Sequence, residues 1–301
     1  MSRTSVLSDE QWARIEPLMP CSDGLRGRPF RDHRPVIEGI VYRFRAGIAW
    51  RDLPESFGPW QTVWKRHRRF SGDGTWDQIL TRLLAQADAS GLINWSVSAD
   101  STVNRAHQHA TNLPRDPAST GGSVELHESA SRTADHAIGR SRGGLSTKIH
   151  HLCDGQMRPL VMLVGPGQGG DSPMFTHLLE ALSVPRIGPG RPRTRPDRAL
   201  GDKAYSSRAN RALLRRRHIQ AVIPEPDDQI GHRRRRGRQG GRPVSYDHET
   251  YKSRNTVERS FNLFKQWRGP ATRYDKLALT YRGGIVLRAI TTWLKHLGDT
   301  P

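Results

Sequence analysis

The sequence predicts an α+β protein in which a small all-helical part comes first and a sheet flanked by helices follows. Apolar residues recur at helical spacing through residues 8–88, whereas strand-like runs appear only after residue 95. Helical spacing returns after the last strand candidate, Gln220–Ile223. We therefore expect a helical domain over residues 1–90 and a second domain over residues 91–301.

The chain is strongly basic, which narrows the classes of partner. It has 301 residues and a formal net charge of +19, and only seven of its 48 basic residues are lysine. Guanidinium groups bind phosphate oxygens in pairs, so this excess of arginine favours nucleic acid as the partner. A protein of the membrane surface is the competing interpretation, but we find neither a long amphipathic basic helix nor a lipidation signal.

Nothing in the sequence predicts a membrane span or an exported protein. The first residues are polar, and the longest apolar run, Leu160–Val164, is far too short to cross a bilayer. Cys21 and Cys153 form neither a disulfide framework nor a zinc motif. We therefore expect a soluble, cytoplasmic protein without a membrane partner.

Two helices are expected before residue 47. The first opens with Ser8 and Gln11, which form a capping-box pattern, and Pro17 should kink or end it. Asp32 can cap the second helix, whose apolar residues recur at helical spacing until the Ala46-Gly47 end.

A basic third helix begins at about Pro59. With the second helix and the glycine-containing connection it forms a helix-turn-helix-like arrangement. In that interpretation four side chains meet DNA: Gln61, Lys65, Arg66 and Arg69. The alternative is a plain helical bundle with a basic exterior, because the whole chain is cationic. A further helix over residues 76–88 would close this domain.

Two short strand candidates end in aspartate. Residues Ser96–Asp100 alternate in polarity, and Arg198–Asp202 repeats the pattern of a short strand followed by a carboxylate. A carboxylate at the end of a strand lies at the rim of a sheet, where metals and substrates bind. Ser206 or Ser207 can cap a helix that runs to about Arg217.

The clearest hairpin signal lies between these two candidates. Leu145–Cys153 and Arg158–Val164 flank the turn dipeptide Asp154-Gly155. We expect Asp154 to shape the turn rather than to bind a ligand. Residues 111–143 are polar and without period, so they are expected to form a loop.

A second loop is expected over residues 225–250, where Arg233–Arg236 are consecutive. A run of like charges is usually a solvated, mobile segment. Because this segment lies between Asp202 and the C-terminal helices, contact with a DNA backbone is the alternative.

Two further patterns are weak. Residues 165–170 match the G-x-G-x-x-G of dinucleotide-binding proteins and follow a strand. However, that strand belongs to a hairpin, and Pro166 removes an N–H where a phosphate cradle needs donors. His107 and His109 have the spacing of metal ligands, but no third ligand stands out, so we expect surface or DNA contacts for them.

Residues Tyr251–Lys265 predict a helix with two distinct faces. At 100° per residue, Arg254, Glu258 and Lys265 fall about 60°, 20° and 40° to one side of the first residue. A phenol, two cations and a carboxylate thus share one stripe beside an apolar stripe of valine and phenylalanine. This stripe suits a site for a metal ion and phosphates, whereas ordinary i,i+4 pairing explains only Arg254 and Glu258.

These four polar residues, with gaps of two, three and six residues, resemble the signature of DDE transposases of bacterial insertion sequences. The surrounding residues resemble the insertion-sequence-five family. The strings at 100–110 and 201–205 resemble that family's first and second aspartate motifs. The family often has another aspartate at the position of Ser206, a departure that touches a cap or a supporting role and not the metal ligand.

The resemblance covers nearly the whole chain and implies a ribonuclease-H-like fold, with an α/β-type core of mixed sheet flanked by helices. It also implies that Asp100, Asp202 and Glu258 are the catalytic, metal-binding carboxylates. Three converging carboxylates repel one another, and two Mg²⁺ (or Mn²⁺) ions resolve this repulsion because Mg²⁺ prefers carboxylate and phosphate oxygens.

The implied activity is metal-dependent hydrolysis of DNA at the terminal inverted repeats of an insertion sequence, followed by transfer of the 3′-OH ends to target DNA. Arg254 and Lys265 would bind phosphates near the cut, and Tyr251 would lie beside the backbone. Paired ends imply a homodimer or a larger assembly. We expect a bacterial enzyme associated with the nucleoid.

Two other functions remain open at this point. A metal-dependent nuclease that cuts without joining would use the same carboxylates. A non-catalytic helix-turn-helix DNA-binding regulator would use residues 33–70. That regulator would leave the polar stripe unexplained, and a change of Glu258 would not affect it.

Overall fold

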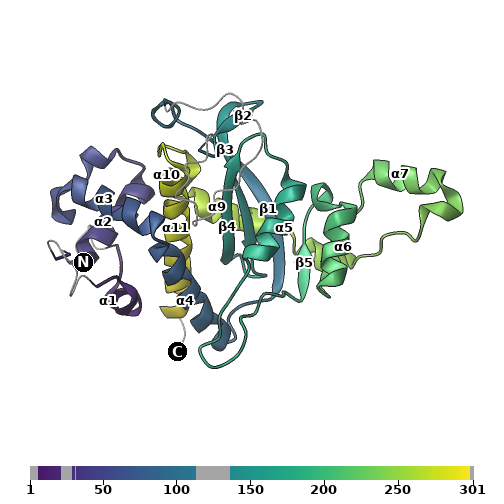
Figure 1. The fold of residues 1–301 in the computed structure, drawn as a ribbon, viewed down its shortest axis with the longest axis horizontal. Helices are drawn as coiled ribbons and strands as arrows, with labels where there is room; N and C mark the ends of the chain where they lie inside the picture. Colours follow the sequence, from purple (N-terminus) through teal and green to yellow (C-terminus); the bar gives the residue numbers. More distant parts are fainter. Residues whose placement is uncertain (1–5, 22–28, 31, 113–135, 299–301) are drawn as a thin grey trace.

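The computed structural model describes residues 6–21, 29–30, 32–112 and 136–298, and Figure 1 shows them as an elongated molecule. The N-terminal helices lie at one end, the sheet lies in the middle, and a helical arm projects at the other end (Figure 1). The loop expected over residues 111–143 falls mostly outside the described residues.

The first two helices begin where the capping residues predict. In α1 (Asp9–Ile15), the Ser8 hydroxyl accepts from the Gln11 N–H and the Gln11 side chain accepts from the Ser8 N–H. A 3₁₀ turn that contains Pro17 follows, η1 (Glu16–Leu18). The Asp32 carboxylate accepts from the Arg34 N–H at the start of α2 (His33–Ala46). The capping pattern was therefore sufficient to place both helix starts.

The helical part continues with two long helices, α3 (Trp60–Gly72) and α4 (Thr75–Ala89). Gly47 ends α2 in the left-handed conformation at φ 68°, as expected for a C-terminal glycine. The connection to α3 then includes two 3₁₀ turns, η2 (Trp50–Asp52) and η3 (Glu55–Phe57). It is therefore longer than the three- or four-residue turn of a standard helix-turn-helix motif.

The sheet is mixed, as predicted. Its strands are β1 (Ser96–Arg105), β2 (Gly139–Ser141), β3 (Gly144–Cys153), β4 (Pro159–Pro166), β5 (Arg198–Leu200) and β6 (Gln220–Val222). The order is β4-β3-β1-β5-β6, and β2 also pairs with β3. The pairs of β3 with β1 and β4 are antiparallel, whereas β1, β5 and β6 are parallel.

The expected hairpin is confirmed, including the role of Asp154. Its carboxylate accepts from the N–H groups of Gln156 and Arg158, which closes the turn between β3 and β4. The same carboxylate forms a buried ion pair with the Arg158 guanidinium. Because β4 returns antiparallel to β3, the glycine-rich segment after β4 does not belong to a parallel dinucleotide-binding unit.

The prediction that the first strand ends at Asp100 was wrong. Strand β1 continues to Arg105, because residues 101–105 pair with Ser146–His150 of β3. The partner residues lie 41 to 49 positions further along the chain, so local polarity did not reveal these hydrogen bonds. The second strand is confirmed, but β5 ends at Leu200 and Asp202 follows two residues later.

Helices cover both faces of the sheet. Helix α5 (Asp171–Ala181) packs on one face and α9 (Asn255–Lys265) packs on β1 and β3, while α6 (Arg208–Arg216) lies against β6. The long C-terminal helix α11 (Ala278–Gly298) contacts α3 and α4 as well as β4. Figure 1 shows α11 between the N-terminal helices and the sheet, and the buried apolar side chains form one continuous cluster.

The segment that carries the four signature residues differs from expectation. The helix expected over residues 251–265 is divided into α8 (His248–Lys252) and α9, with Ser253 and Arg254 between them. The Asp247 carboxylate accepts from the N–H groups of Glu249 and Thr250, so it starts α8 before the signature. A short helix, α10 (Arg268–Ala271), follows α9.

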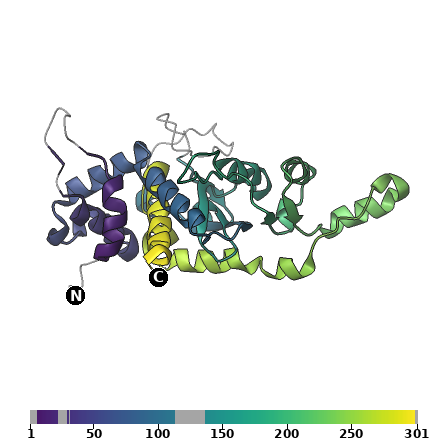
Figure 2. The same ribbon diagram turned by 90° about the horizontal axis from the view of Figure 1, so that it is seen from below.

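The loop expected over residues 225–250 contains helix α7 (Asp227–Arg235) and the turn η6 (Gly237–Gly240). Its arginine run forms the last turn of a helix whose first turn holds two aspartates, so the charges match the helix dipole at both ends. Figures 1 and 2 show this segment projecting from the body as an arm.

Buried arginines join distant segments of the chain. The Arg273 guanidinium donates to the carbonyls of Ala137, Asp275 and Lys276 and to the Thr147 hydroxyl. The Arg43 guanidinium of α2 lies 2.7 Å from the Asp275 carboxylate, and both side chains are buried.

No helix in the described part of the chain is both long and apolar enough to span a membrane.

Candidate active site

The sheet register places two aspartates side by side. Ser98 of β1 pairs with Leu200 of β5 in parallel. Asp100 within β1 and Asp202 just after the end of β5 each lie two residues beyond that pair, and the two strands run in the same direction. Parallel strands advance together, so the two carboxylates meet at the same edge of the sheet.

The third carboxylate reaches this edge from helix α9. The Arg254 guanidinium lies 2.9 Å from the Asp100 carboxylate and 2.6 Å from the Glu258 carboxylate, and it joins the helix to the strand. The Asp100 and Arg254 side chains are 18% and 19% exposed, whereas Glu258 is 55% exposed. The site is therefore open to solvent on the side of Glu258.

The charges at this edge act on one another. The pKa of Asp100 is raised to about 6, mainly by burial and also by the charges of Asp202 and Glu258, which together outweigh the lowering by the Ser101 N–H and Arg254. For Arg254, burial acts to lower the pKa, but the charges of Asp100, Glu258 and Asp202 outweigh burial and raise it. Both shifts indicate that the three carboxylates share one electrostatic environment.

The remaining residues of the signature flank this cluster. The Lys265 ammonium donates to the Thr102 hydroxyl at 2.7 Å, two residues along β1 from Asp100. Tyr251 lies on α8, where its ring packs against Tyr246 at 5.5 Å between centroids. Burial raises the pKa of Tyr251, and its phenol is influenced by Arg254 and Asp202. Arg254, Glu258 and Lys265 thus lie at β1, whereas Tyr251 lies on α8 near Arg254 and Asp202.

The donor chemistry of the cluster fits a hard divalent cation. Carboxylate oxygens are the ligands that Mg²⁺ and Mn²⁺ prefer. Among the residues that the structure describes, however, no three His, Cys, Asp or Glu side chains stand close enough together to hold a metal ion as placed. One carboxylate oxygen of Asp100 and one of Glu258 accept from Arg254.

The DNA contacts expected on α3 are distributed unevenly. Gln61, Lys65 and Arg69 are exposed, and Arg69 forms a weak pair with Asp73 at 3.5 Å. Arg66 is buried: its guanidinium lies 3.9 Å from the centre of the Phe30 ring and contacts the His33 ring nitrogen. Arg66 therefore packs inside the helical part, and of the four expected contacts the other three lie on the exposed surface of α3.

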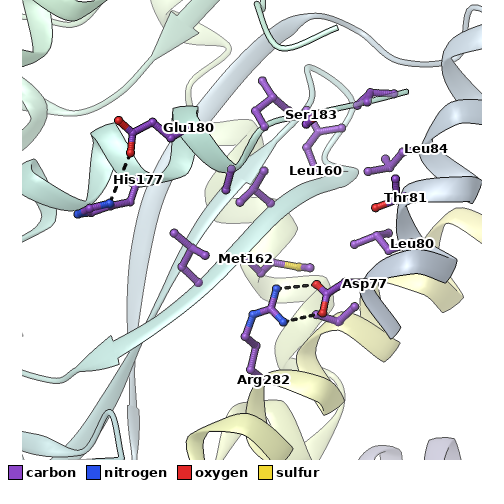
Figure 3. A pocket seen from close by; sticks show the side chains of 16 residues that line it. Asp77, Leu80, Thr81, Leu84, Leu160, Met162, His177, Glu180, Ser183 and Arg282 are labelled. Carbon is purple, nitrogen blue, oxygen red and sulfur yellow. Dashed lines mark hydrogen bonds and ion pairs between the residues drawn. The ribbon is translucent and has the colours of Figure 1, made fainter. Parts of the chain in front are cut away.

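Other candidate features do not join the carboxylates. The rings of His107 and His109 pack on each other, and His107 also packs on Tyr274, which fits neither a metal site nor the carboxylate cluster. A cavity of about 590 Å³ lies between α4, β4, α5 and α11. Figure 3 shows apolar side chains there beside the Arg282–Asp77 ion pair, and none of the three carboxylates lines it.

The sequence did not indicate the residues that support Asp100 from the α5 side of β1, Ser101 and Asp171. The Ser101 N–H donates to the Asp100 carboxylate, and the Ser101 hydroxyl donates to Asp171 at the start of α5. The sequence signal beside this cluster is the glycine-rich segment that ends immediately before Asp171, and its pattern by itself indicates only a dinucleotide-binding motif.

Comparison with known proteins identifies the family of the domain in which this cluster lies. The model of a family described as "Transposase DDE domain" matches residues 96–292, which include the whole sheet and all three carboxylates. A second family model, described as "Putative transposase of IS4/5 family", matches residues 7–80. No solved structure matches the chain.

Two curated relatives match about a third of the chain. The uncharacterized protein y4sN of Sinorhizobium fredii is 37% identical over 110 residues, which cover 36% of this chain and 83% of that protein. The insertion element IS402 uncharacterized 16.2 kDa protein of Burkholderia cepacia is 36% identical over 108 residues, which cover 34% of this chain and 74% of that protein.

The fold and the matched domain define this chain as a transposase with a DDE domain. More narrowly, it belongs to the insertion-sequence transposases of the IS4/5 group, because the family match at the N-terminus and the insertion-element relative agree. The resemblance noted from the four signature residues is thereby confirmed.

Proposed function

We propose that this transposase binds the terminal inverted repeats of its insertion sequence, cleaves the DNA there and transfers the 3′-OH ends to target DNA. The observation that carries the proposal is the register of β1 and β5, which brings Asp100 and Asp202 to one edge, where Arg254 ties Glu258 to Asp100. This arrangement supports a site in which three carboxylates act on a single phosphodiester.

In this proposal Asp100, Asp202 and Glu258 hold two Mg²⁺ or Mn²⁺ ions. When bound, the metal supplies activation of water or of a 3′-hydroxyl and stabilisation of the leaving oxygen. Asp100 sits on a paired strand and Asp202 caps η5 (Lys203–Tyr205) through the Ala204 N–H, so both are held by backbone structure. The Glu258 side chain is the most exposed of the three and is therefore free to change its conformation when substrate binds.

The cationic members of the signature would position the DNA. Arg254 contacts Asp100 and Lys265 contacts Thr102, two residues further along β1, and each can exchange its present partner for a phosphate oxygen. Tyr251 would lie beside the backbone next to Arg254. These side chains would hold the scissile phosphate against the carboxylates.

Two surfaces distant from the carboxylates would bind the DNA duplex. One is the exposed face of α3 with Gln61, Lys65 and Arg69, in a domain that we propose spans residues 1–90. The other is the arm of α7 and η6 within the catalytic domain of residues 91–301. Because two DNA ends must be brought together, we propose that the active assembly is at least a dimer and acts at the bacterial nucleoid.

The experiment uses a duplex that carries the terminal repeat of the element, a supercoiled target plasmid, and Mg²⁺ or Mn²⁺. Wild type should cut at the repeat boundary and join the ends to the plasmid, whereas Glu258→Gln should bind the duplex and do neither. Cutting without joining would replace transposition by nuclease activity. Binding by both proteins without cutting would instead favour a DNA-binding regulator.

A further inference from the structure

The glycine-rich segment of residues 165–170 brings the chain unusually close to β3. A Cβ at Gly167 would lie 2.0 Å from the Ser146 hydroxyl, and one at Gly165 would lie 3.5 Å from the His150 ring. The Gly169 carbonyl accepts from the Lys148 ammonium at 2.7 Å. Glycine is thus required at Gly167 by close approach to β3, and the segment leads directly into Asp171 at the start of α5.

The Asp171 carboxylate is the centre of a polar cluster on this face of the sheet. One of its oxygens accepts from the Ser101 hydroxyl at 2.6 Å and from the Lys148 ammonium at 3.0 Å. His150 lies 3.8 Å from the same oxygen, but burial lowers the pKa of His150 to about 4, so this ring is neutral near pH 7. Lys148 is therefore the cation that balances Asp171.

Ser101 links this cluster to the carboxylate site. Successive residues of a strand point to opposite faces, so Asp100 faces α9 while Ser101 faces α5. The Ser101 backbone N–H nevertheless donates to the Asp100 carboxylate at 2.8 Å. The Ser101 side chain is held by Asp171 on the α5 face. This contact thus fixes the Ser101 N–H, which orients the Asp100 carboxylate on the α9 face.

We propose that Asp171 is a positioning residue for Asp100 and acts through Ser101. The proposal rests on the proposed function, in which Asp100 binds metal. Asp171 holds the Ser101 hydroxyl, the held residue fixes the N–H, and the N–H sets the orientation of the Asp100 carboxylate. Partners one step removed from a metal commonly change its affinity by about ten- to a hundredfold.

The ordinary alternative is that Asp171 only stabilises the fold. An acidic residue in the first turn of a helix is favourable, and its ion pair with Lys148 joins α5 to β3. That alternative predicts a loss of stability without a change in metal affinity, because Asp171 does not contact Asp100. A measurement of metal binding can therefore detect whether Asp171 acts on Asp100 through the hydrogen bonds of Ser101.

The test measures Mn²⁺ binding to the full chain by electron paramagnetic resonance, without DNA, together with the rate of single-turnover cleavage. The variants are Ser101→Ala, Asp171→Asn and their combination. We expect each single change to weaken Mn²⁺ binding and slow cleavage by about tenfold while the affinity for DNA is unchanged. The double variant should be no worse than the poorer single variant, because both changes break one chain of contacts.

Two control variants make the test specific. Ser101→Thr keeps the hydroxyl and should retain the affinity of wild type. Glu180 is an exposed carboxylate on α5, and among the described residues it pairs only with His177. Glu180→Gln should therefore behave as wild type. Unchanged Mn²⁺ affinity in both single variants, or losses that multiply in the double variant, would overturn the positioning role.

Asp100→Asn separates this inference from the proposed function on which it rests. If Asp100→Asn loses Mn²⁺ binding while Ser101→Ala and Asp171→Asn keep it, only the positioning role fails. If Asp100→Asn binds Mn²⁺ as wild type does, the metal assignment of the proposed function fails as well.

Discussion

Arg254 holds Asp100 across the gap between helix α9 and strand β1, with 2.9 Å between guanidinium nitrogen and carboxylate oxygen. The same guanidinium lies 2.6 Å from Glu258. One cation therefore occupies oxygens of two of the three proposed metal ligands. Because an oxygen oriented toward a guanidinium is not free for a metal ion, Arg254 and a metal compete for these carboxylates, and a DNA phosphate would relieve the competition by attracting Arg254.

The first prediction follows from this competition. Arg254→Gln should bind Mn²⁺ roughly five- to tenfold more tightly than wild type in the absence of DNA, because an ion pair of this exposure is worth about 1 kcal/mol. The measurement is Mn²⁺ titration followed by electron paramagnetic resonance. The matched control is Arg259→Gln, which removes the same charge from an exposed position on the same helix.

Equal tightening in Arg254→Gln and Arg259→Gln would show that only net charge matters. Unchanged affinity in Arg254→Gln would mean that the guanidinium does not compete with the metal at all. Either result would contradict the exchange of Arg254 between carboxylates and phosphate.

The raised pKa of Asp100 predicts a specific dependence on pH. Burial raises that pKa to about 6 from its ordinary value of 3.8, and the ionised form is the one that binds a cation. Affinity for Mn²⁺ should therefore rise as the pH increases through about 6 and become constant above about 7. A Mn²⁺ affinity that stays level between pH 5 and pH 7 would contradict this assignment.

The same pKa shift has the opposite effect on the stability of the metal-free protein. The native carboxyl binds its proton more tightly than the unfolded chain does, so its contribution to stability is complete below about pH 4 and is lost as the pH rises through 6. Asp100→Asn mimics the neutral carboxyl and should abolish this part of the pH dependence in urea denaturation. An identical pH profile in wild type and Asp100→Asn would count against it.

The arm of α7 and η6 predicts a dependence on salt. Arg233 is tied to Glu225 at 3.1 Å, whereas Arg234, Arg235 and Arg236 are exposed. Changing these three arginines to Gln should make the slope of log affinity for DNA against log salt concentration shallower by about 0.9 for each phosphate that the arm no longer neutralises. The cleavage rate at saturating DNA should not change.

The control for the arm is a second triple variant with the same loss of charge. Arg186, Arg191 and Arg195 are exposed in the connection between α5 and β5, and their change to Gln should leave the salt slope close to that of wild type. Equal slopes in both triple variants would show that the arm has no particular role in DNA binding.

The buried pair of Arg43 and Asp275 predicts a large effect on stability. Asp275→Asn leaves a buried guanidinium without its counter-charge, so the free energy of unfolding should fall by about 3–5 kcal/mol. Urea denaturation measures this change. The exposed pair of Glu249 and Lys252 provides the comparison, and Glu249→Gln should cost no more than about 0.5 kcal/mol.

Features encoded by neighbouring residues could be predicted from the sequence. The capping residues Ser8 and Asp32 and the turn at Asp154 depend on contacts within a few residues of the chain. Such contacts are short enough in the chain for side-chain chemistry alone to indicate them.

Features that depend on remote partners could not be predicted in the same way. The extension of β1 beyond Asp100 needs β3, and the linkage of Arg254 to Asp100 joins residues 154 positions apart. The burial of Arg66 depends on the ring of Phe30, so a helical periodicity that marks α3 as basic cannot tell a packed arginine from an exposed one. For these features the sequence indicates which residue types are present, but only the fold determines which residues contact one another and which are buried.

The most direct test of the central claim is single-turnover cleavage of a terminal-repeat duplex with Mn²⁺ by wild type, Asp100→Asn, Asp202→Asn and Glu258→Gln. Each change should slow cleavage by about a thousandfold or more while the affinity for the duplex stays within about twofold. Glu249→Gln, an exposed carboxylate on α8, should cut at the rate of wild type. Cleavage at the wild-type rate by any one of the three carboxylate variants would contradict the account.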